Sequence, residues 1–416
     1  MSKIDDMIKK LCPNGVEYKT LGEVSEIARG ASPRPISQFI TDSPDGIPWI
    51  KIGDVGNNAK YITSTEEKVT REGAAKSRFL KKGAFILSNS MSFGRPYILA
   101  IDGCIHDGWI SLQNFNSVFV PDFLYYLLRS KNLQNFWNQK ASLGTVRNLN
   151  ADIIRATPVP IPPIPVQEEI VRILDNFTKL EAELEAELEA RKKQYEYYRD
   201  KLLSFNELHI GQPGGVRLMA LGEIGTFVRG NGLQKKDFVE SGVGCIHYGQ
   251  IYTYYGTHTT KTKSFVSPEL AERLKKAHPG DLVIATTSEN VEDVCKAVAW
   301  LGTEDICISG DAYVFRHDQN PKYMAYIFQT ESFFQHKKKY CSGTKVIRVS
   351  DVNMAKYVAP IPSLAEQERI VSILDKFDAL VNDLTSGLPA ELTARRQQYE
   401  YYRDRLLSFT PIFQGA

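Results

Sequence analysis

The stretch Gln194–Asp200 has the sequence QYEYYRD, and the same seven letters return at Gln398–Asp404. The flanks repeat as well, as RKKQYEYYRDKLLSF against RRQQYEYYRDRLLSF. Upstream, PIPPIPVQEEIVRILDNFTKL at 160–180 matches PIPSLAEQERIVSILDKFDAL at 360–380. Such self-similarity at a nearly fixed offset indicates an internal duplication, so the chain is predicted to consist of two related halves.

Both repeated segments have the pattern of a long helix. Proline suits a first helical turn, so we expect a helix to begin near Pro165 and to run over 166–204, about 58 Å at ~1.5 Å per residue. Apolar residues recur there in alternating three- and four-residue steps, which is typical of a coiled-coil seam. In the first copy they are Ile170, Ile173, Phe177, Leu180, Leu184, Leu188, Tyr195, Tyr198 and Leu202, and in the second Ile370, Ile373, Phe377, Leu380, Leu384, Tyr399, Tyr402 and Leu406. Because neither helix can bury such a stripe alone, the two are expected to pack as an antiparallel pair.

The second helical segment carries four extra residues around LTSGLPAEL, and Gly387 and Pro389 are expected to kink or break the helix there. The tyrosines of each QYEYYRD copy cover more than one helix face, so two of each trio are expected in the seam. The flank then holds Tyr197, Arg199, Tyr401 and Arg403, which either pack on the helix or bind a partner protein, since Tyr and Arg are enriched in interfaces.

The segments between the helices repeat only at their ends. LGEVSEIARG at 21–30 matches LGEIGTFVRG at 221–230, and GTVRNLNADI at 144–153 resembles GTKVIRVSDV at 343–352, whereas the centres diverge. Short strand-like runs, such as WIKIGDV and CIHYGQIYTYY, precede one amphipathic helix in each segment, at 121–139 and 321–340. We therefore predict an α+β protein with two globular domains, at 1–160 and 206–359, which we call the first and second variable domains. Helical spacers at 161–205 and 360–416 form a coiled coil that separates them, with pseudo-two-fold symmetry.

Composition excludes several classes of protein. The chain has 416 residues, 43% of them hydrophobic and 24% charged, which is ordinary globular composition. It contains no apolar run long enough to span a membrane and does not open with a signal peptide, so we expect a cytoplasmic protein with no membrane partner. Six scattered cysteines lack metal-ligand spacing, and free thiols are favoured although disulfides stay open.

Charge alternates along the chain. Residues 1–165 carry a net charge of +5 and 205–363 carry +2, whereas 166–204 carry −3 and 364–416 carry −2. Two basic modules fit a polyanion, and the side chains that suit phosphates and base edges are Arg, Lys, Gln and Asn. The candidates in the first variable domain are Arg29, Arg34, Lys51, Arg95, His106, Lys140 and Arg147. Those in the second are Arg229, Lys235, Lys236, His247, Tyr248, Gln250, Tyr252, Tyr254, Lys338, Lys345 and Arg348, with Tyr255, Lys337 and Lys339 beside them. For each of these, a solvated surface charge or a packed strand face is the competing interpretation.

No catalytic or metal-binding motif is found. The chain lacks NPPY and DPPY, the GxxxxGK phosphate loop, HExxH and GxSxG. HDG at 106–108 and SGD at 309–311 match in position between the halves, and we interpret both as turns that close a strand. We therefore predict no catalytic residues, no metal and no cofactor in this chain.

Two divergent domains that alternate with two near-identical helical segments, each opening with PIPxxxxQExIVxILDxF and closing with RxxQYEYYRDxLLSF, resemble the DNA specificity (S) subunit of type I restriction-modification enzymes. The resemblance covers nearly the whole chain; in the variable domains it is limited to LGEV…RG, the GDV or GQI turn and the GT stretch before PIP.

The resemblance implies that each variable domain is a target recognition domain that reads one half of a bipartite site in double-stranded DNA. The helices would set the gap and dock two methyltransferase subunits, which in turn recruit restriction subunits that translocate DNA. S-adenosylmethionine, ATP and Mg are then expected on those partners. Two alternatives stay open: a stand-alone nuclease or methyltransferase, which the missing motifs disfavour, and a protein-binding adaptor with a coiled-coil spacer that does not bind DNA.

Overall fold

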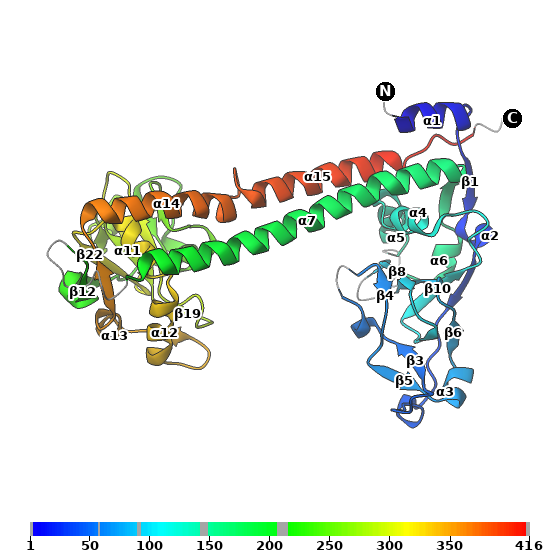
Figure 1. The fold of residues 1–416 in the computed structure, drawn as a ribbon, viewed down its shortest axis with the longest axis horizontal. Helices are drawn as coiled ribbons and strands as arrows, with labels where there is room; N and C mark the ends of the chain where they lie inside the picture. Colours follow the sequence, from blue (N-terminus) through cyan, green and yellow to red (C-terminus); the bar gives the residue numbers. More distant parts are fainter. Residues whose placement is uncertain (1–2, 57–58, 90–92, 142–148, 206–214, 413–416) are drawn as a thin grey trace. The chain divides into compact units, whose positions relative to one another are not determined.

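The computed structural model describes residues 3–56, 59–89, 93–141, 149–205 and 215–412, and these divide into two compact units (Figure 1). The first unit comprises residues 1–183 and 393–416, and the second comprises 184–392. Each unit contains one variable domain and half of the helix pair, so the four-segment division expected from the sequence stays a prediction. Among the described residues no helix is both long and apolar enough to cross a membrane.

The described part of the first unit forms three sheets. A two-stranded antiparallel ribbon pairs β1 (Glu17–Thr20) with β11 (Pro158–Ile161). A five-stranded sheet has the order β2 (Glu26–Arg29), β10 (Trp109–Gln113), β7 (Phe85–Ser88), β8 (Pro96–Leu99) and β4 (Tyr61–Ile62). A four-stranded sheet has the order β5 (Glu67–Val69), β3 (Ile47–Ile50), β9 (Gly103–Ile105) and β6 (Arg78–Leu80). Its short helices are α1 (Lys3–Leu11), α2 (Leu21–Val24), α3 (Arg71–Ala75), α4 (Pro121–Leu128), α5 (Lys131–Ala141) and α6 (Ala151–Arg155).

The second unit repeats this topology strand for strand. Its ribbon is β12 (Arg217–Ala220) with β24 (Val358–Ile361). Its five-stranded sheet is β13 (Gly225–Arg229), β22 (Ala312–His317), β18 (Leu282–Ala285), β20 (Lys296–Trp300) and β15 (His258–Thr259). Its four-stranded sheet is β16 (Ser264–Val266), β14 (Val243–Ile246), β21 (Ile306–Ile308) and β17 (Lys276–Ala277), and a further pair joins β19 (Thr287–Ser288) to β23 (Ile347–Arg348). Its short helices are α8 (Leu221–Ile224), α9 (Tyr248–Thr253), α10 (Pro268–Ala271), α11 (Pro321–Ile327), α12 (Glu331–Tyr340) and α13 (Asp351–Ala355). The α+β fold and its duplication are confirmed.

The predicted helices are present. One helix, α7 (Ile164–Leu203), covers the first repeated segment, and the second forms α14 (Leu364–Asn382) and α15 (Leu388–Leu406). The expected interruption lies between α14 and α15, and Gly387 lies in it at a close approach, where a Cβ would be 2.4 Å from the Ala379 carbonyl oxygen. Asp383 accepts hydrogen bonds from Thr385 and Ser386 in this turn, and these bonds lower the pKa of its carboxyl to about 2.

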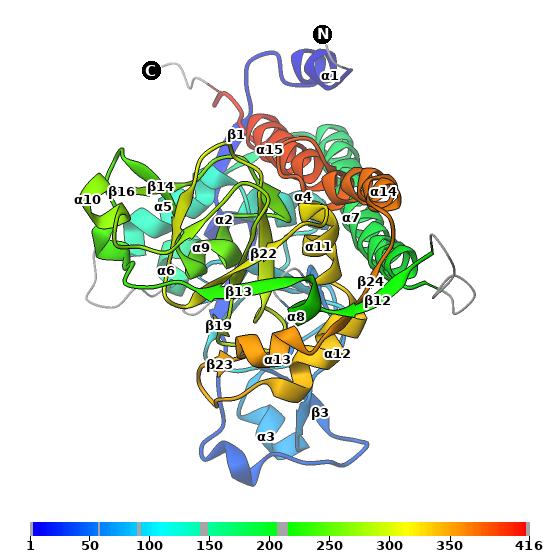
Figure 2. The ribbon, with the colours of Figure 1, turned by 90° about the vertical axis from the view of Figure 1, so that its left-hand side faces the viewer.

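The helices pair antiparallel within each unit. In the first, Phe177 of α7 stacks on Tyr402 and Glu181 forms an ion pair with Arg396, so rising numbers on α7 meet falling numbers on α15. In the second, Tyr198 stacks on Phe377, and the Tyr195 hydroxyl lies 3.5 Å from Asp378 of α14. Figure 2 shows α11 beside α14, so the second variable domain packs on its helix pair.

Three positions of the predicted seam are wrong. Leu180 is 48% exposed, Leu380 39% and Leu384 78%, the last because it lies in the turn after α14. Two lone helices can cover only a narrow stripe of each other. The deeply buried helix positions, Leu174 and Leu374 among them, instead pack against the variable domains.

Two further expectations need correction. The segments 121–139 and 321–340 each form two helices, because Ser130 and Thr330 begin a new helix by accepting the backbone N–H of Leu133 and Phe333. The run HYGQIYTYY is α9 and its flanks instead of a strand and turn, since the His247 side chain caps it by accepting the Gly249 N–H.

One buried glutamine joins each helix to its variable domain. Gln167 has no exposed surface; its side-chain oxygen accepts the Val120 N–H at 2.9 Å, and its amide nitrogen donates to the carbonyls of Val118 and Pro162. Gln367 repeats this in the second unit, where it accepts the Asn320 N–H and donates to the Pro362 carbonyl. Each glutamine therefore ties the start of the long helix to the start of α4 or α11.

The segments near both ends of the chain meet in the first unit. Val16 and Pro411 form an isolated parallel β-bridge, and the Tyr18 hydroxyl donates to the Phe409 carbonyl at 2.9 Å. Ile4 of α1 and Leu407 lie in the same hydrophobic core as the variable domain. Residues 393–412 thus complete a unit that begins some four hundred residues earlier.

All six cysteines are free, and five of them are buried.

We predict that Gln167→Ala lowers the free energy of unfolding of the first unit by about 3 kcal/mol, because it leaves the Val120 N–H and two carbonyls unsatisfied in a buried site. Urea unfolding followed by tryptophan fluorescence measures this, since Trp49, Trp109 and Trp137 are buried in this unit. The control Glu168→Ala changes an exposed neighbour and should cost under ~0.5 kcal/mol. Equal losses for the two variants would contradict the anchoring role.

Candidate nucleic-acid interface

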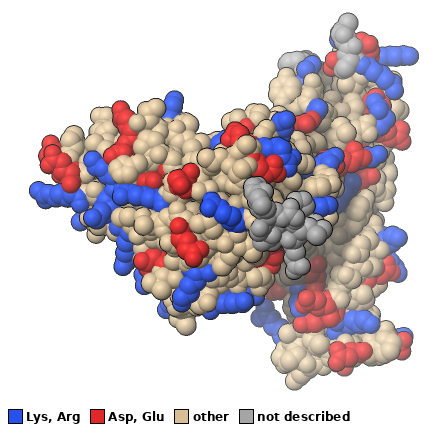
Figure 3. Space-filling view, turned by 60° about the vertical axis from the view of Figure 1, so that its left-hand side comes forward, with Lys and Arg blue, Asp and Glu red and all other residues tan. Residues whose placement is uncertain are grey.

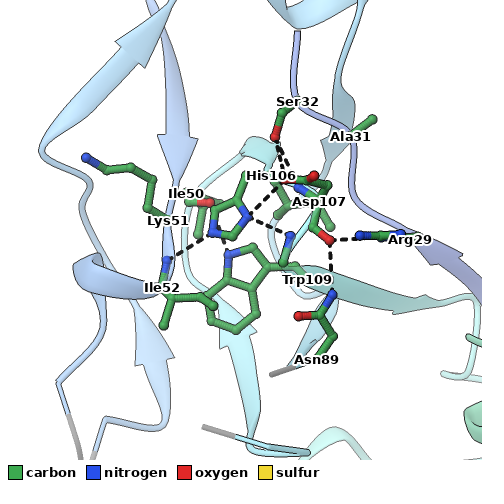
Figure 4. A network of polar contacts seen from close by, with 12 residues as sticks. Arg29, Ala31, Ser32, Ile50, Lys51, Ile52, Asn89, His106, Asp107 and Trp109 are labelled. Atoms are coloured by element: carbon green, nitrogen blue, oxygen red, sulfur yellow. Dashed lines mark hydrogen bonds and ion pairs between the residues drawn. The ribbon is translucent and has the colours of Figure 1, made fainter. Parts of the chain in front are cut away.

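Three segments of the first variable domain meet where its two large sheets adjoin: the end of β2 with Arg29, the turn Lys51–Asp54 after β3, and the turn His106–Gly108 between β9 and β10 (Figure 4). We call this site the junction. The Arg29 Nε donates to the Asp107 carbonyl at 2.9 Å, and the Ser32 hydroxyl donates to the Asp107 carboxylate at 2.8 Å. The Arg34 guanidinium lies 3.6 Å from the same carboxylate. Cations and one carboxylate are thereby fixed together at a partly exposed surface.

His106 forms the inner wall of the junction. Its Nδ1 accepts the Gly108 N–H at 2.7 Å, while the Ile52 N–H points at Nε2 from 3.3 Å. Burial lowers the pKa of this imidazole, so the two backbone N–H groups face a neutral ring. Trp49 and Trp109 flank the ring at 6.3 and 6.1 Å between centroids.

The second variable domain has the same hydrogen-bond frame built from different side chains. Arg229 Nε donates to the Gly310 carbonyl at 3.2 Å, as Arg29 does to Asp107. The Ser309 hydroxyl takes the place of His106 and accepts the Tyr248 N–H at 2.9 Å. An amide in the second domain also corresponds to a carboxylate in the first. The Gln250 side chain accepts the His247 N–H, as the Asp54 side chain accepts the Lys51 N–H. The backbone hydrogen bonds are therefore retained while the side chains that accept them change.

The shared RG motif is explained by a close crossing of the chain. A Cβ on Gly30 would lie 2.0 Å from the His106 carbonyl oxygen, and one on Gly230 would lie 2.1 Å from that of Ser309. Only glycine fits either crossing, and the arginine before it is held at the strand end. The HDG and SGD segments are turns between strands, as predicted.

The junction gathers four of the seven candidates in the first variable domain: Arg29, Arg34, Lys51 and His106. Of these, Lys51 is ion-paired with Glu67 at 2.7 Å. Arg95 is partly buried, and the Lys140 ammonium lies over the Phe136 ring on α5. Arg147 lies outside the described residues. Whether any of them contacts DNA stays a prediction.

The candidates of the second variable domain divide into four groups. Arg229, Lys235, Lys236, His247, Tyr248 and Gln250 lie on or beside the junction segments, and Lys338, Lys345 and Arg348 are exposed around α12 and β23. Tyr254 is 57% exposed with the Lys263 ammonium 4.5 Å from its ring centroid. Lys339 is also exposed on α12. Tyr252, Tyr255 and Lys337 are structural, because the Tyr252 hydroxyl donates to the Thr287 carbonyl, Tyr255 is buried, and buried Lys337 donates to the carbonyls of Glu292 and Val294.

Sequence reasoning missed Asp107, Arg273 and Lys275. Asp107 was interpreted only as part of a turn, yet its carboxylate binds Ser32 and Arg34. Arg273 and Lys275 belong to the run RLKK, whose charge density was a usable signal. Their proximity to Arg229 depends on a contact across forty residues that no local pattern indicates.

The repeated QYEYYRD segment exposes its middle tyrosine in both copies. Tyr197 and Tyr401 are each 61% exposed. The arginines of the predicted flank are not free: only 12% of the Arg199 side chain and 14% of the Arg403 side chain is exposed, and each contacts the aspartate that follows it. They also lie over the rings of Tyr195 and Tyr399. The side chains exposed in both copies of this segment are therefore tyrosine and glutamate, and not arginine.

Two stretches, residues 13–190 and 213–394, match the family model described as the type I restriction modification DNA specificity domain. The EcoR124I/EcoR124II specificity subunit of Escherichia coli is 35% identical over 260 residues, which span 61% of this chain and 63% of that relative. The putative type I restriction enzyme specificity subunit S.HindORF215P of Haemophilus influenzae is 31% identical over 414 residues, or 95% of this chain and 96% of the relative. These matches define the class of protein as a duplicated DNA specificity domain.

Two solved structures share the fold. A chain from work on complex assembly and conformational transition of the type I R-M system has a TM-score of 0.66 at 19% identity and covers 95% of this chain and 98% of its own. The HsdS subunit from Thermoanaerobacter tengcongensis has a TM-score of 0.52 at 18% identity and covers 95% and 97%. This chain belongs to the family of type I restriction-modification specificity subunits.

We predict that the first unit loses stability as the pH falls below about 6.5 through His106, its only histidine. The folded pKa of this group is lowered, so the unfolded chain takes up a proton below its ordinary value of about 6.5 that the folded unit resists. Urea midpoints from tryptophan fluorescence should fall more in the wild type than in His106→Gln, whose amide keeps an acceptor for Gly108. Equal falls would contradict the buried neutral imidazole.

Proposed function

We propose that this chain is the non-catalytic, sequence-specific subunit of a type I restriction-modification complex and that each variable domain reads one half of a bipartite site in double-stranded DNA. One observation carries the proposal: the two junctions keep the same hydrogen bonds but exchange their side chains, as Asp54 with Gln250 and His106 with Ser309. A DNA-reading domain needs a constant backbone and variable side chains, since base identity is distinguished by side-chain donors and acceptors.

Different exposed groups suit different base edges. The first junction offers a guanidinium and a carboxylate, which match guanine acceptors and the cytosine amino group. The second offers the exposed Arg229 guanidinium and the partly exposed Gln250 amide, whose Nε2 donates to the Ser264 hydroxyl at 2.6 Å, whereas His247 is buried. Each good base contact contributes ~1–3 kcal/mol of discrimination, so a few such groups suffice for one half-site.

The helices serve as spacer and docking surface. Two methyltransferase subunits, each carrying S-adenosylmethionine, bind the two copies of the repeated segment, and restriction subunits with ATP and Mg join through them. Identical partners require near-identical surfaces, and the two QYEYYRD copies expose Tyr197 and Tyr401 equally. Tyrosines with a large exposed area are frequent interface anchors.

Exchanging the two variable domains tests the half-by-half assignment. A chain with residues 21–157 and 221–357 swapped should methylate a site whose halves are interchanged, with the gap unchanged. Sequencing of methylated bases in cells that express the chain with its methyltransferase measures this. An unaltered site would refute the assignment, and the absence of any salt-dependent DNA affinity would favour the adaptor alternative.

We predict that Tyr197→Ala combined with Tyr401→Ala weakens assembly with the methyltransferase at least ~10-fold, because two exposed anchors are lost. Stability should change by less than ~0.5 kcal/mol, since both side chains lie on the surface. Sedimentation or light scattering of mixed subunits measures assembly. The matched control, Glu196→Ala with Glu400→Ala, alters exposed neighbours in the same segment and should assemble normally. Equal behaviour of both pairs would remove the tyrosines from the interface.

A further inference from the structure

Five exposed cations line one surface of the second variable domain beside its junction. They are Arg229, Lys235, Lys236, Arg273 and Lys275, and we call them the basic ridge. Figure 3 shows lysine and arginine side chains along the margin of this unit, with acidic side chains among them. The ridge comes from two segments, 229–236 and 273–275, which are distant in sequence.

Specific contacts fix these two segments side by side. The Asn231 side chain donates to the Arg273 carbonyl at 2.9 Å and accepts the Lys275 N–H at 2.7 Å. Beneath them, Leu233 and Leu274 are buried in one hydrophobic cluster. The ridge is thus a preformed array of cations, so little backbone ordering remains when an anion binds.

The ridge cations are free of ion pairs. In the described part of the chain no carboxylate lies within ion-pair distance of any of the five, and this includes Asp237 and Glu272 on the same segments. The Asp237 carboxylate instead accepts the Gln234 N–H at 2.8 Å. Full charges therefore face solvent here, where they attract polyanions most strongly.

Two cations of the first variable domain, Arg34 and Lys76, instead form ion pairs, whereas Arg29 and Arg78, the register counterparts of Arg229 and Lys275, donate to backbone carbonyls. Arg34 lies 3.6 Å from Asp107, and Lys76, which matches Arg273, is 2.9 Å from Glu72. Strand register places Gly310 where the first domain has Asp107, because each lies three residues before the partner of Arg29 or Arg229. Net charge favours the first domain, +5 against +2, so the difference is one of pairing rather than of total charge.

We propose that the basic ridge binds DNA phosphates and gives the second variable domain sequence-independent affinity, while Asp107 holds Arg34 of the first variable domain in an ion pair. This inference rests on the proposed function. A phosphate that approaches Arg34 must displace a carboxylate, whereas one that approaches Lys235 or Lys236 displaces only solvent and counterions. Each phosphate neutralised releases counterions and contributes about 0.9 to the slope of log affinity against log salt.

Salt dependence of binding tests the ridge. The full chain, assembled with its methyltransferase, is titrated with a duplex that contains its mapped site and with a scrambled duplex, from about 50 to 200 mM salt. Lys235→Gln with Lys236→Gln should reduce the magnitude of the slope by about 1–2 units and weaken both duplexes by the same factor. An unchanged methylation site shows that the variant is folded and still specific.

Two single substitutions test the effect of this carboxylate. One adds a carboxylate to the second domain, and the other removes it from the first. A Cβ on Gly310 has its closest neighbour at 3.8 Å, so Gly310→Asp fits, and its carboxylate beside Arg229 should lower the slope. Asp107→Asn keeps the shape of the side chain, frees Arg34 and should raise the slope by up to about 1. Arg34→Gln alone should change the slope less than either lysine substitution.

The outcomes separate the two proposals. If the lysine pair leaves the slope unchanged while the complex still methylates its site, the ridge is overturned and the proposed function stands. If Arg34→Gln lowers the slope as much as a ridge lysine, the asymmetry between the domains is overturned. A wild-type complex that does not distinguish its site from the scrambled duplex would overturn the proposed function, and the ridge assignment with it.

Discussion

The buried amides of Gln167 and Gln367 hold the architecture together. A long helix rich in glutamate and lysine has only a narrow apolar stripe, so its direction must be fixed where it begins. Each amide meets two or three backbone groups at once, and such bonds are directional in a way that apolar contacts are not. Tyr126 and Tyr326, which donate to Asp175 and Asp375 one or two turns later, fix the rotation of the same helices.

This rigidity permits the variability of the junctions. Backbone N–H groups in the turns must be satisfied, but a carboxylate, an amide, a hydroxyl or an imidazole can each accept them. The fold therefore constrains the position of an acceptor and leaves its chemical type open. Evolution can change the groups presented to a ligand without moving the strands that carry them.

The parts of the structure that could be predicted from sequence are those with a local or periodic cause. Duplication, the long helices and the break at Gly387 follow from repeated letters, apolar spacing and backbone chemistry. A strand and turn were predicted where α9 forms because its N-cap, His247, is an uncommon capping residue. Leu180 was placed in the seam because apolar spacing alone cannot distinguish a seam between two helices from a deeper core. The pairing of Arg34 with Asp107 joins residues more than seventy positions apart, and Asn231 spans more than forty to hold Arg273 and Lys275. Contacts of that range leave no trace in one sequence.

The discontinuity of the first unit has a consequence for synthesis on the ribosome. Residues 184–392 form one uninterrupted unit, so it can complete its own contacts as soon as it emerges. The first variable domain emerges earlier, yet Val16, Tyr18 and the core around Ile4 lack their partners until residues 399–411 are made. The half of the protein that is translated first therefore completes its contacts last. Until Tyr399 and Tyr402 are made, Phe177 of α7 lacks the aromatic side chains that cover it.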